Sequence, residues 1–301
     1  MLTIINLFFI NCDTITNSNS KGEIIDPGWN PPFFTLDTEP DWHPFQDTIT
    51  YVHSPRDSTY ISKDGIWLLD LNTMHKEFLT KGSAPEWSPD GNKIAFWYKG
   101  NINIINIKTR AITKITSCGA YYPTWSSDGK KIYFDTNYQS KKGGNVIWKI
   151  NVGGSNLECI TKQGTGEWRE PKCSPDGYTI LHRRFSSASI SSELTLMDTN
   201  GLNPVRLTFN DYPESGYDWS PDGKKIVYGY YPDKMKYPDS SGIYILETDT
   251  KTITKICDGI GYPTFSPDGS KIIYYGSYKE KYGILWIMNS DGTDNQPLTV
   301  P

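Results

Sequence analysis

Long helical patterns are missing from this chain of 301 residues. Nowhere are apolar residues held at helical spacing through three or four turns, which excludes a mainly helical fold. Blocks of like charge are also missing, and the formal net charge is only −4. A nucleic-acid-binding protein would show a clustered basic face, so we expect no nucleic-acid partner. The cysteines include no Cys-x-x-Cys pair, which argues against a zinc site.

Catalytic sequence motifs are missing as well. The chain has no Gly-x-Ser-x-Gly, no His-Glu-x-x-His, no phosphate loop and no dinucleotide fingerprint. Each of the four histidines stands alone in its own segment. We therefore name no catalytic residue, expect no cofactor and leave metal binding open. Two carboxylates from different loops could still form a glycosidase site, so a carbohydrate-active lyase or hydrolase remains the alternative.

Aromatic residues and turn formers are abundant. Phe, Trp and Tyr make up 14% of the chain, which also has 26 Gly and 20 Pro. Aromatic side chains suit pleated sheets, while Gly and Pro suit tight turns, so this mixture is typical of many short strands. The composition predicts an all-β fold.

A tetrapeptide repeat organises the chain. Ser88-Pro89-Asp90-Gly91 recurs with small changes at 126–129, 174–177, 220–223 and 266–269, and residues 43–46 are a degenerate copy. The residues that precede the copies follow one another every 38 to 48 positions; they are Trp42, Trp87, Trp125, Cys173, Trp219 and Phe265. This period is that of one propeller blade.

Each repeat reads as four strands. The first ends in the aromatic residue, and Ser-Pro-Asp-Gly reverses the chain because Pro presets φ, Asp bonds the backbone and Gly supplies a positive φ. Turn geometry fully explains these aspartates. A second strand, a third strand, an Asp-Gly turn and a short fourth strand ending in Leu-Thr or Ile-Thr follow. The pattern predicts a six-bladed β-propeller of four-stranded antiparallel blades over residues 41–301.

The repeat Pro-x-Trp-Ser-Pro-Asp-Gly, followed by Lys-Ile-x-Phe/Tyr, Asp-Gly and Leu-Thr, closely resembles the propeller repeats of the TolB family. Similar repeats occur in prolyl oligopeptidase-like peptidases and in some pectin-fragment lyases. The resemblance covers roughly residues 39–299, and it implies a protein partner in the bacterial envelope. Residues 1–40 are too few for the α/β domain that precedes the propeller in TolB, so the resemblance is to the propeller alone.

The N-terminal residues differ from the repeats. Residues 1–10 are almost wholly apolar, as in the centre of a secretory signal, and Cys12 follows in a loose lipoprotein-like context. We predict a leader and tether over residues 1–20 and a run-in segment over 21–40 that adds a strand at the ring seam. The protein is then exported, periplasmic or membrane-anchored, and contacts the membrane only through a lipid on Cys12.

Strand parity places every long insertion on one face. The loops after second and fourth strands include 52–65, 135–144, 162–170, 182–192 and 229–241, and we call the face that carries them the long-loop face. The opposite, short-turn face carries only tight turns. Long loops on a rigid scaffold usually carry binding residues, and Tyr, Trp and Arg dominate binding hot spots. The predicted contact residues are Tyr121, Tyr122, Trp168, Arg169, Arg183, Arg184, Tyr217, Tyr230, Tyr231 and Tyr262.

The residue before each repeat aromatic is expected to face the central channel. Four of these residues are charged: Asp41, Glu86, Lys172 and Asp218. Three carboxylates facing one lysine could hold a cation or a basic peptide segment. We therefore expect a non-catalytic, monomeric scaffold that binds an envelope protein or peptide through the long-loop face and the channel mouth.

Overall fold

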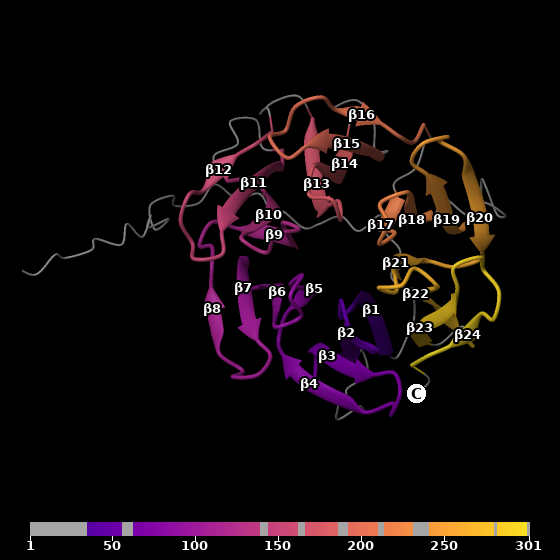
Figure 1. The fold of residues 1–301 in the computed structure, drawn as a ribbon. Helices are drawn as coiled ribbons and strands as arrows, with labels where there is room; N and C mark the ends of the chain where they lie inside the picture. Colours follow the sequence, from indigo (N-terminus) through magenta and orange to yellow (C-terminus); the bar gives the residue numbers. More distant parts are fainter. Residues whose placement is uncertain are drawn as a thin grey trace, which may run out of the picture. The chain divides into compact units, whose positions relative to one another are not determined.

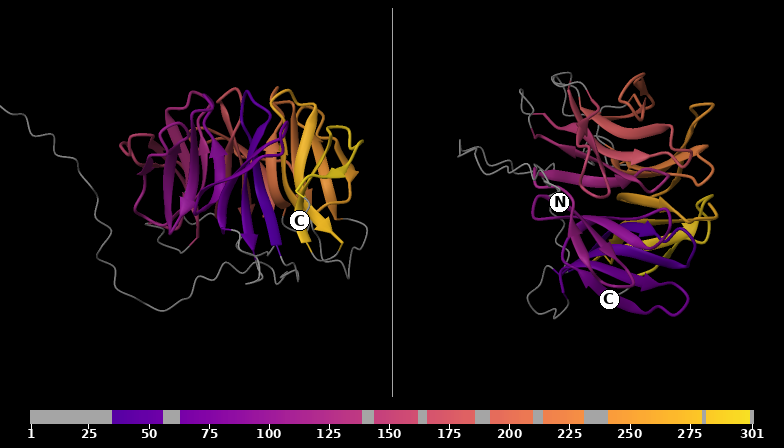
Figure 2. Two further views of the ribbon diagram at one scale, coloured as in Figure 1. Left: turned by 90° about the horizontal axis from the view of Figure 1, so that it is seen from below. Right: turned by 60° about the vertical axis from the view of Figure 1, so that its left-hand side comes forward.

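The computed structural model of the chain describes residues 35–55, 63–138, 144–161, 166–185, 192–209, 214–230, 241–279 and 282–299. All of them belong to one compact unit, Phe33–Pro301. The regular secondary structure of these residues consists of strands, which form sheets arranged around a common axis (Figure 1). In the side view, the strands run along that axis (Figure 2). The fold is an all-β propeller with four-stranded antiparallel blades, as predicted.

Four blades are separate sheets. Their strands are β5 (Ser83–Trp87), β6 (Lys93–Tyr98), β7 (Asn101–Asn106) and β8 (Ile112–Lys114); β9 (Ala120–Trp125), β10 (Lys131–Thr136), β11 (Val146–Asn151) and β12 (Glu158–Cys159); β13 (Glu167–Cys173), β14 (Thr179–Phe185), β15 (Ser192–Asp198) and β16 (Val205–Arg206); β17 (Glu214–Trp219), β18 (Lys225–Tyr230), β19 (Gly242–Glu247) and β20 (Ile253–Cys257).

The remaining strands form one eight-stranded sheet. It contains β1 (Thr35–Trp42), β2 (Thr48–Pro55), β3 (Gly65–Asp70), β4 (Lys76–Thr80), β21 (Gly261–Phe265), β22 (Lys271–Tyr278), β23 (Tyr282–Asn289) and β24 (Gln296–Pro297). Its two antiparallel halves come from opposite ends of the chain. They meet where β1 pairs in parallel with β23, with Leu36 opposite Gly283. This contact merges the two halves into one sheet. The number of separate sheets therefore does not establish the predicted six blades, and that number stays a prediction.

The Ser-Pro-Asp-Gly turns have the predicted chemistry. In the first full copy, the Ser88 hydroxyl donates to an Asp90 oxygen at 2.5 Å and accepts the Lys93 N–H at 3.0 Å. Gly91 adopts a φ of 67° and donates its N–H to the Ser88 carbonyl. The hydroxyl of Ser88 lowers the pKa of Asp90, because it stabilises the charged carboxylate. The aspartate is therefore occupied within the turn, which confirms its structural role.

The repeat aromatics lie in equivalent places, as predicted. Each of the six residues is the last residue of a first strand, namely β1, β5, β9, β13, β17 or β21. The aromatic ones are buried, whereas Cys173 is partly buried against the core. Trp125 belongs to a cluster that includes residues of β6, β10 and β14, so its indole packs between neighbouring blades. These contacts between blades hold the first strands, and hence the channel wall, in place.

Candidate functional site

Each first strand bulges three residues before its last residue. At this position six residues have a φ between 47° and 67°, and we call them the bulge layer: Glu39, Ala84, Tyr122, Glu170, Gly216 and Tyr262. The ladder to the second strand shifts register at the same place. A bulge re-aims the side chains on either side of it. In all but the Gly216 copy a proline follows, which cannot donate to the ladder.

A second set of residues lies two positions further along each strand. We call it the ring layer: Asp41, Glu86, Thr124, Lys172, Asp218 and Thr264. Residues of both layers line a cavity of about 110 Å³ between the first strands. Since the first strands start at the long-loop face, the bulge layer is the nearer of the two to that face.

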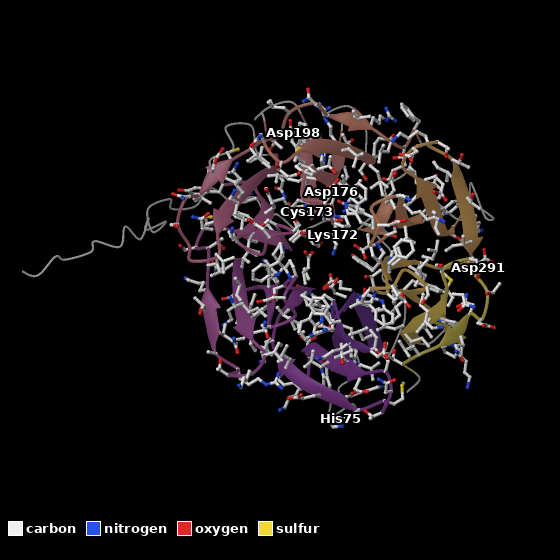
Figure 3. All side chains as sticks on the ribbon, viewed as in Figure 1. His75, Lys172, Cys173, Asp176, Asp198 and Asp291 are labelled. Atoms are coloured by element: carbon white, nitrogen blue, oxygen red, sulfur yellow. The ribbon has the colours of Figure 1, made fainter. Side chains whose placement is uncertain are left out.

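Lys172 joins the charged members of the ring layer. Its Nζ lies 3.0 Å from a Glu86 oxygen and 3.7 Å from oxygens of both Asp41 and Asp218. Figure 3 shows Lys172 reaching toward the centre of the ring. Burial by itself would lower the pKa of Lys172, but the carboxylates of Glu86, Asp218 and Asp41 raise it. The structure thus brings together the four residues that the sequence placed in the channel.

The ring-layer carboxylates also tie neighbouring blades together. Asp41 accepts the N–H of Trp87 at 2.7 Å, and Glu86 accepts the N–H of Trp125 at 3.0 Å. Burial raises the pKa of Asp41 to about 8, because the repulsion from Glu86 and Asp218 adds to it and Lys172 only partly compensates. The single positive charge of Lys172 therefore faces three carboxyl groups, those of Asp41, Glu86 and Asp218.

The bulge layer adds two carboxylates and two phenols to the cavity. Glu39 accepts the N–H of Ala84 at 2.6 Å. The pKa of Glu39 is raised to about 7, mainly by burial and to a smaller extent by the charge of Glu170, while the hydrogen bond from Ala84 acts in the opposite direction. Burial also raises the pKa of Tyr122, as do the carboxylates of Glu170 and Glu39. All four side chains line the same cavity.

Arg183 on β14 holds Glu170. The two side chains form an ion pair, and Arg183 also donates to the backbone carbonyl of Glu214. The Tyr217 hydroxyl donates to the Glu170 carbonyl. Glu170 is thereby fixed at the cavity wall by two neighbouring strands.

Gly216 is the one glycine of the bulge layer. A Cβ at this position would lie 2.5 Å from the Tyr262 Cα, closer than any side chain could approach. Its φ of 67° is also a conformation that L side chains rarely adopt. Glycine thus lets the backbones of β17 and β21 come together beside Tyr262.

Two predicted contact residues lie in the interior instead of at the surface. Trp168 is only 4% exposed, because its ring packs against His182 and lies beneath the Arg184 guanidinium, 4.7 Å from its centroid. Tyr217 is 8% exposed and faces the cavity. The prediction that Trp168 is an exposed anchor is wrong, because its strand turns it into the core between blades.

Other predicted residues form small clusters at the ends of strands. Tyr121 stacks on Trp97 with ring centroids 5.9 Å apart, and Tyr230 meets Tyr244 edge to face. The Arg169 guanidinium pairs with Glu167 at 2.7 Å and lies over the Phe185 ring. Tyr122 and Tyr262 line the cavity instead, and Arg183 pairs with Glu170 of the cavity wall.

Some predictions fall outside the described residues. They concern Tyr231, Cys12, the leader and tether over residues 1–20, and most of the run-in segment. Among the described residues, no group of three or more His, Cys, Asp or Glu side chains could hold a metal ion. No helix in that part of the chain is long and apolar enough to span a membrane.

Glu39 and Glu170 were not predicted as cavity residues. Their signal is present in the repeats, because the residue before Pro stands at the same place in five copies: Glu39-Pro40, Ala84-Pro85, Tyr122-Pro123, Glu170-Pro171 and Tyr262-Pro263. In a regular strand, residues two positions apart point to the same side, so the repeat alone would group Glu39 and Glu170 with Asp41 and Lys172. The bulge at Glu39 and Glu170 was not predicted.

Comparison with known proteins identifies related chains. The uncharacterized protein Atu1656 of Agrobacterium fabrum is 29% identical over 203 residues, which cover 60% of this chain and 67% of that protein. The Tol-Pal system protein TolB of Francisella tularensis subsp. mediasiatica is 39% identical over 84 residues, covering 27% of this chain. The aligned part spans only 18% of that TolB.

Solved structures share the fold. TolB from Acinetobacter baumannii superimposes with a TM-score of 0.64 at 23% identity, over 77% of this chain and 59% of that one. An oligogalacturonate lyase in complex with manganese superimposes with a TM-score of 0.57 at 17% identity, over 87% of this chain and 77% of that one. At such identities the likeness concerns the fold alone.

A family model decides membership. The model of the TolB beta propeller domain matches residues 35–192, which is more than half of the chain. This match includes both carboxylates of the bulge layer and most of the charged ring-layer residues. The chain therefore belongs to the TolB beta propeller domain family.

Proposed function

We propose that this protein is a non-catalytic propeller scaffold of the bacterial cell envelope that binds a protein or peptide through its long-loop face and channel mouth. The observation that carries the proposal is the cavity between the first strands, where acidic and aromatic side chains from separate repeats converge. Aromatic and charged groups in a concave, largely buried setting are the usual anchors of protein recognition. Membership of the TolB beta propeller domain family supports a scaffold of this kind.

Within this proposal, the eight-stranded sheet counts as two blades. Each half has four antiparallel strands and one copy of the repeat, so six repeats make six blades around the channel. The parallel contact between β1 and β23 is then a seam that closes the ring. Residues 41–301 form the propeller. The described residues before Asp41 belong to β1, so they lengthen this first strand at the seam and do not form the separate strand that was predicted.

Binding should depend on the channel mouth and not on the short turns. Because Trp168 is buried, the test uses Tyr122 and Tyr262, which line the cavity. Once a partner has been isolated from envelope extracts, Tyr122→Ala and Tyr262→Ala should each weaken its binding by tenfold or more, about 1.4 kcal/mol. The exposed turn change Asn92→Lys is the control. Calorimetric titration that shows a larger loss for Asn92→Lys would place the binding site on the short-turn face.

We also propose that the protein is exported, and that a lipid on Cys12 is its only membrane contact. The apolar residues 1–10 and the polar residues after them motivate this proposal. Fractionation of the native host should place the protein in the envelope, and radioactive fatty acid should label the protein but not Cys12→Ser. A cytoplasmic protein that retains Met1 would contradict both expectations.

The second candidate function is a carbohydrate-active enzyme. It is favoured by Glu39 and Glu170, two interacting carboxylates in one cavity, since such a pair is what glycoside hydrolysis requires. Incubation with pectin fragments and other oligosaccharides tests it. Turnover that disappears in Glu170→Gln would establish the enzyme in place of the scaffold.

A further inference from the structure

Glu39 is a cavity carboxylate with no cationic partner among the residues that the structure describes. Of the basic side chains near the channel, Lys172 is committed to the ring-layer carboxylates and Arg183 to Glu170. Within the described ranges, no lysine or arginine forms an ion pair with Glu39, which has only the Ala84 N–H as a partner. Burying an acid without a countercharge is costly, and a cation from outside would relieve that cost.

The aromatic lining indicates what kind of cation would fit. Tyr122 and Tyr262 line the same cavity as Glu39. The face of an aromatic ring attracts ammonium and guanidinium groups, whereas hard metal ions require several oxygen ligands. The described residues contain no group of side chains suited to a metal ion. The lower part of the cavity already holds an ammonium group between carboxylates, that of Lys172.

We propose that the channel mouth binds the ammonium or guanidinium group of a basic side chain, inserted by a partner polypeptide from the long-loop face, with Glu39 as its counterion and Tyr122 and Tyr262 as its aromatic walls. This inference rests on the proposed function and specifies the chemistry of the partner. It assigns recognition to three bulge-layer residues from separate repeats, while Lys172 and the ring layer form the floor of the site.

Binding of such a side chain is coupled to a proton. Because burial raises the pKa of Glu39 to about 7, part of the protein carries a neutral Glu39 at neutral pH. A cation favours the ionised carboxylate, so it displaces the proton and binds more tightly as the pH rises from 6 to 8. A proton is released to the buffer when the cation binds near pH 7.

Calorimetric titration with small probes tests the proposal on the full chain. The cationic probes are Nα-acetyl-arginine amide and Nα-acetyl-lysine amide, and the uncharged probes are Nα-acetyl-citrulline amide and Nα-acetyl-norleucine amide. At pH 8 we expect the cationic probes to bind with a millimolar Kd and the uncharged probes to bind at least about tenfold more weakly. At pH 6 the cationic probes should bind more weakly, and at pH 7 the measured heat should depend on the ionisation heat of the buffer.

Variants identify the residues. Glu39→Gln keeps an acceptor for the Ala84 N–H but removes the charge, and it should weaken cationic probes by about tenfold. It should also reduce the pH dependence to the part that Asp41 contributes, whose pKa of about 8 lies in the same range. Glu77→Gln is the matched control, because Glu77 pairs with Arg110 in an exposed ion pair outside the cavity lining. Should Glu39→Gln fail to fold, Tyr262→Leu tests the aromatic wall, and it should weaken the same probes.

Three results would overturn the inference. They are equal binding of charged and uncharged probes, binding unaffected by Glu39→Gln or Tyr262→Leu in folded protein, and displacement of the probes by millimolar calcium chloride. If the probes fail but Tyr122→Ala still weakens binding of an isolated partner, the scaffold function stands and only the recognition of a basic side chain is wrong.

Discussion

Replacing Trp125 or Trp219 with alanine is expected to lower the free energy of unfolding by about 3–5 kcal/mol. The two indoles are 3% and 7% exposed, and each donates its Nε1–H to a backbone carbonyl of the preceding blade, Glu86 and Lys172 respectively. Truncation removes a large apolar contact between blades and leaves a cavity there. Urea denaturation followed by circular dichroism measures the loss.

Phe45→Ala is the control for these substitutions. Phe45 occupies the degenerate turn of the first repeat and is 72% exposed, so its removal should change the free energy of unfolding by no more than about 0.5 kcal/mol. A tryptophan variant as stable as the Phe45 variant would show that the repeat aromatics do not hold the blades together.

His182→Phe is expected to stabilise the protein, most strongly in acid. His182 is fully buried on β14, at the place that Phe96 and Phe134 occupy in β6 and β10. Among the described residues, neither ring nitrogen has a hydrogen-bond partner of normal geometry. Burial lowers the pKa of His182 to about 3, with a smaller effect of Arg184 in the same direction. The imidazole therefore stays neutral in the folded state.

The sign of the pH effect follows from proton binding. Between pH 6.5 and pH 3 the unfolded chain binds a proton at this histidine and the folded protein does not, so the free energy of unfolding falls as the pH is lowered. At about 1.4 kcal/mol per pH unit, the loss from this group reaches about 3 kcal/mol at pH 4. His182→Phe removes this loss, and the raised pKa values of Glu39 and Asp41 act equally in both proteins.

Urea titrations at pH 7, 5 and 4 compare the two proteins. The difference between them should be smallest at pH 7 and grow toward pH 4. His75→Gln provides the control, because His75 is exposed and its replacement should leave the pH dependence unchanged. Parallel curves for the original protein and His182→Phe would mean that the buried imidazole takes up a proton without cost.

Much of the fold could be predicted because its signals are local. The Ser-Pro-Asp-Gly turns close through bonds between residues two to five apart, as between Ser88 and Asp90. The Leu-Thr and Ile-Thr endings also have a defined role, since Thr116 and Thr161 accept N–H groups of the third strands at 2.9 Å. These two threonines follow fourth strands that end two residues earlier than predicted.

The candidate site was predicted in part. Asp41, Glu86, Lys172 and Asp218 could be grouped because the repeat places each of them directly before its aromatic residue. Trp168 was misplaced because loop length indicates which face a segment approaches but not which way a given ring turns. Trp168 is buried by His182 and Arg184 of the neighbouring strand, and the residues around Trp168 in the sequence do not indicate these contacts.

By itself, then, the amino-acid sequence determined the repeat, the turn chemistry, the aromatic positions and the ring of charged residues, because each depends on neighbours within a few positions. The tertiary structure alone decided that the strands bulge at Glu39 and its equivalents, and that Glu39, Tyr122, Glu170 and Tyr262 share one cavity. It also decided which acids are held partly protonated. These properties arise from desolvation and from charges on distant repeats, which act only once the blades enclose the channel.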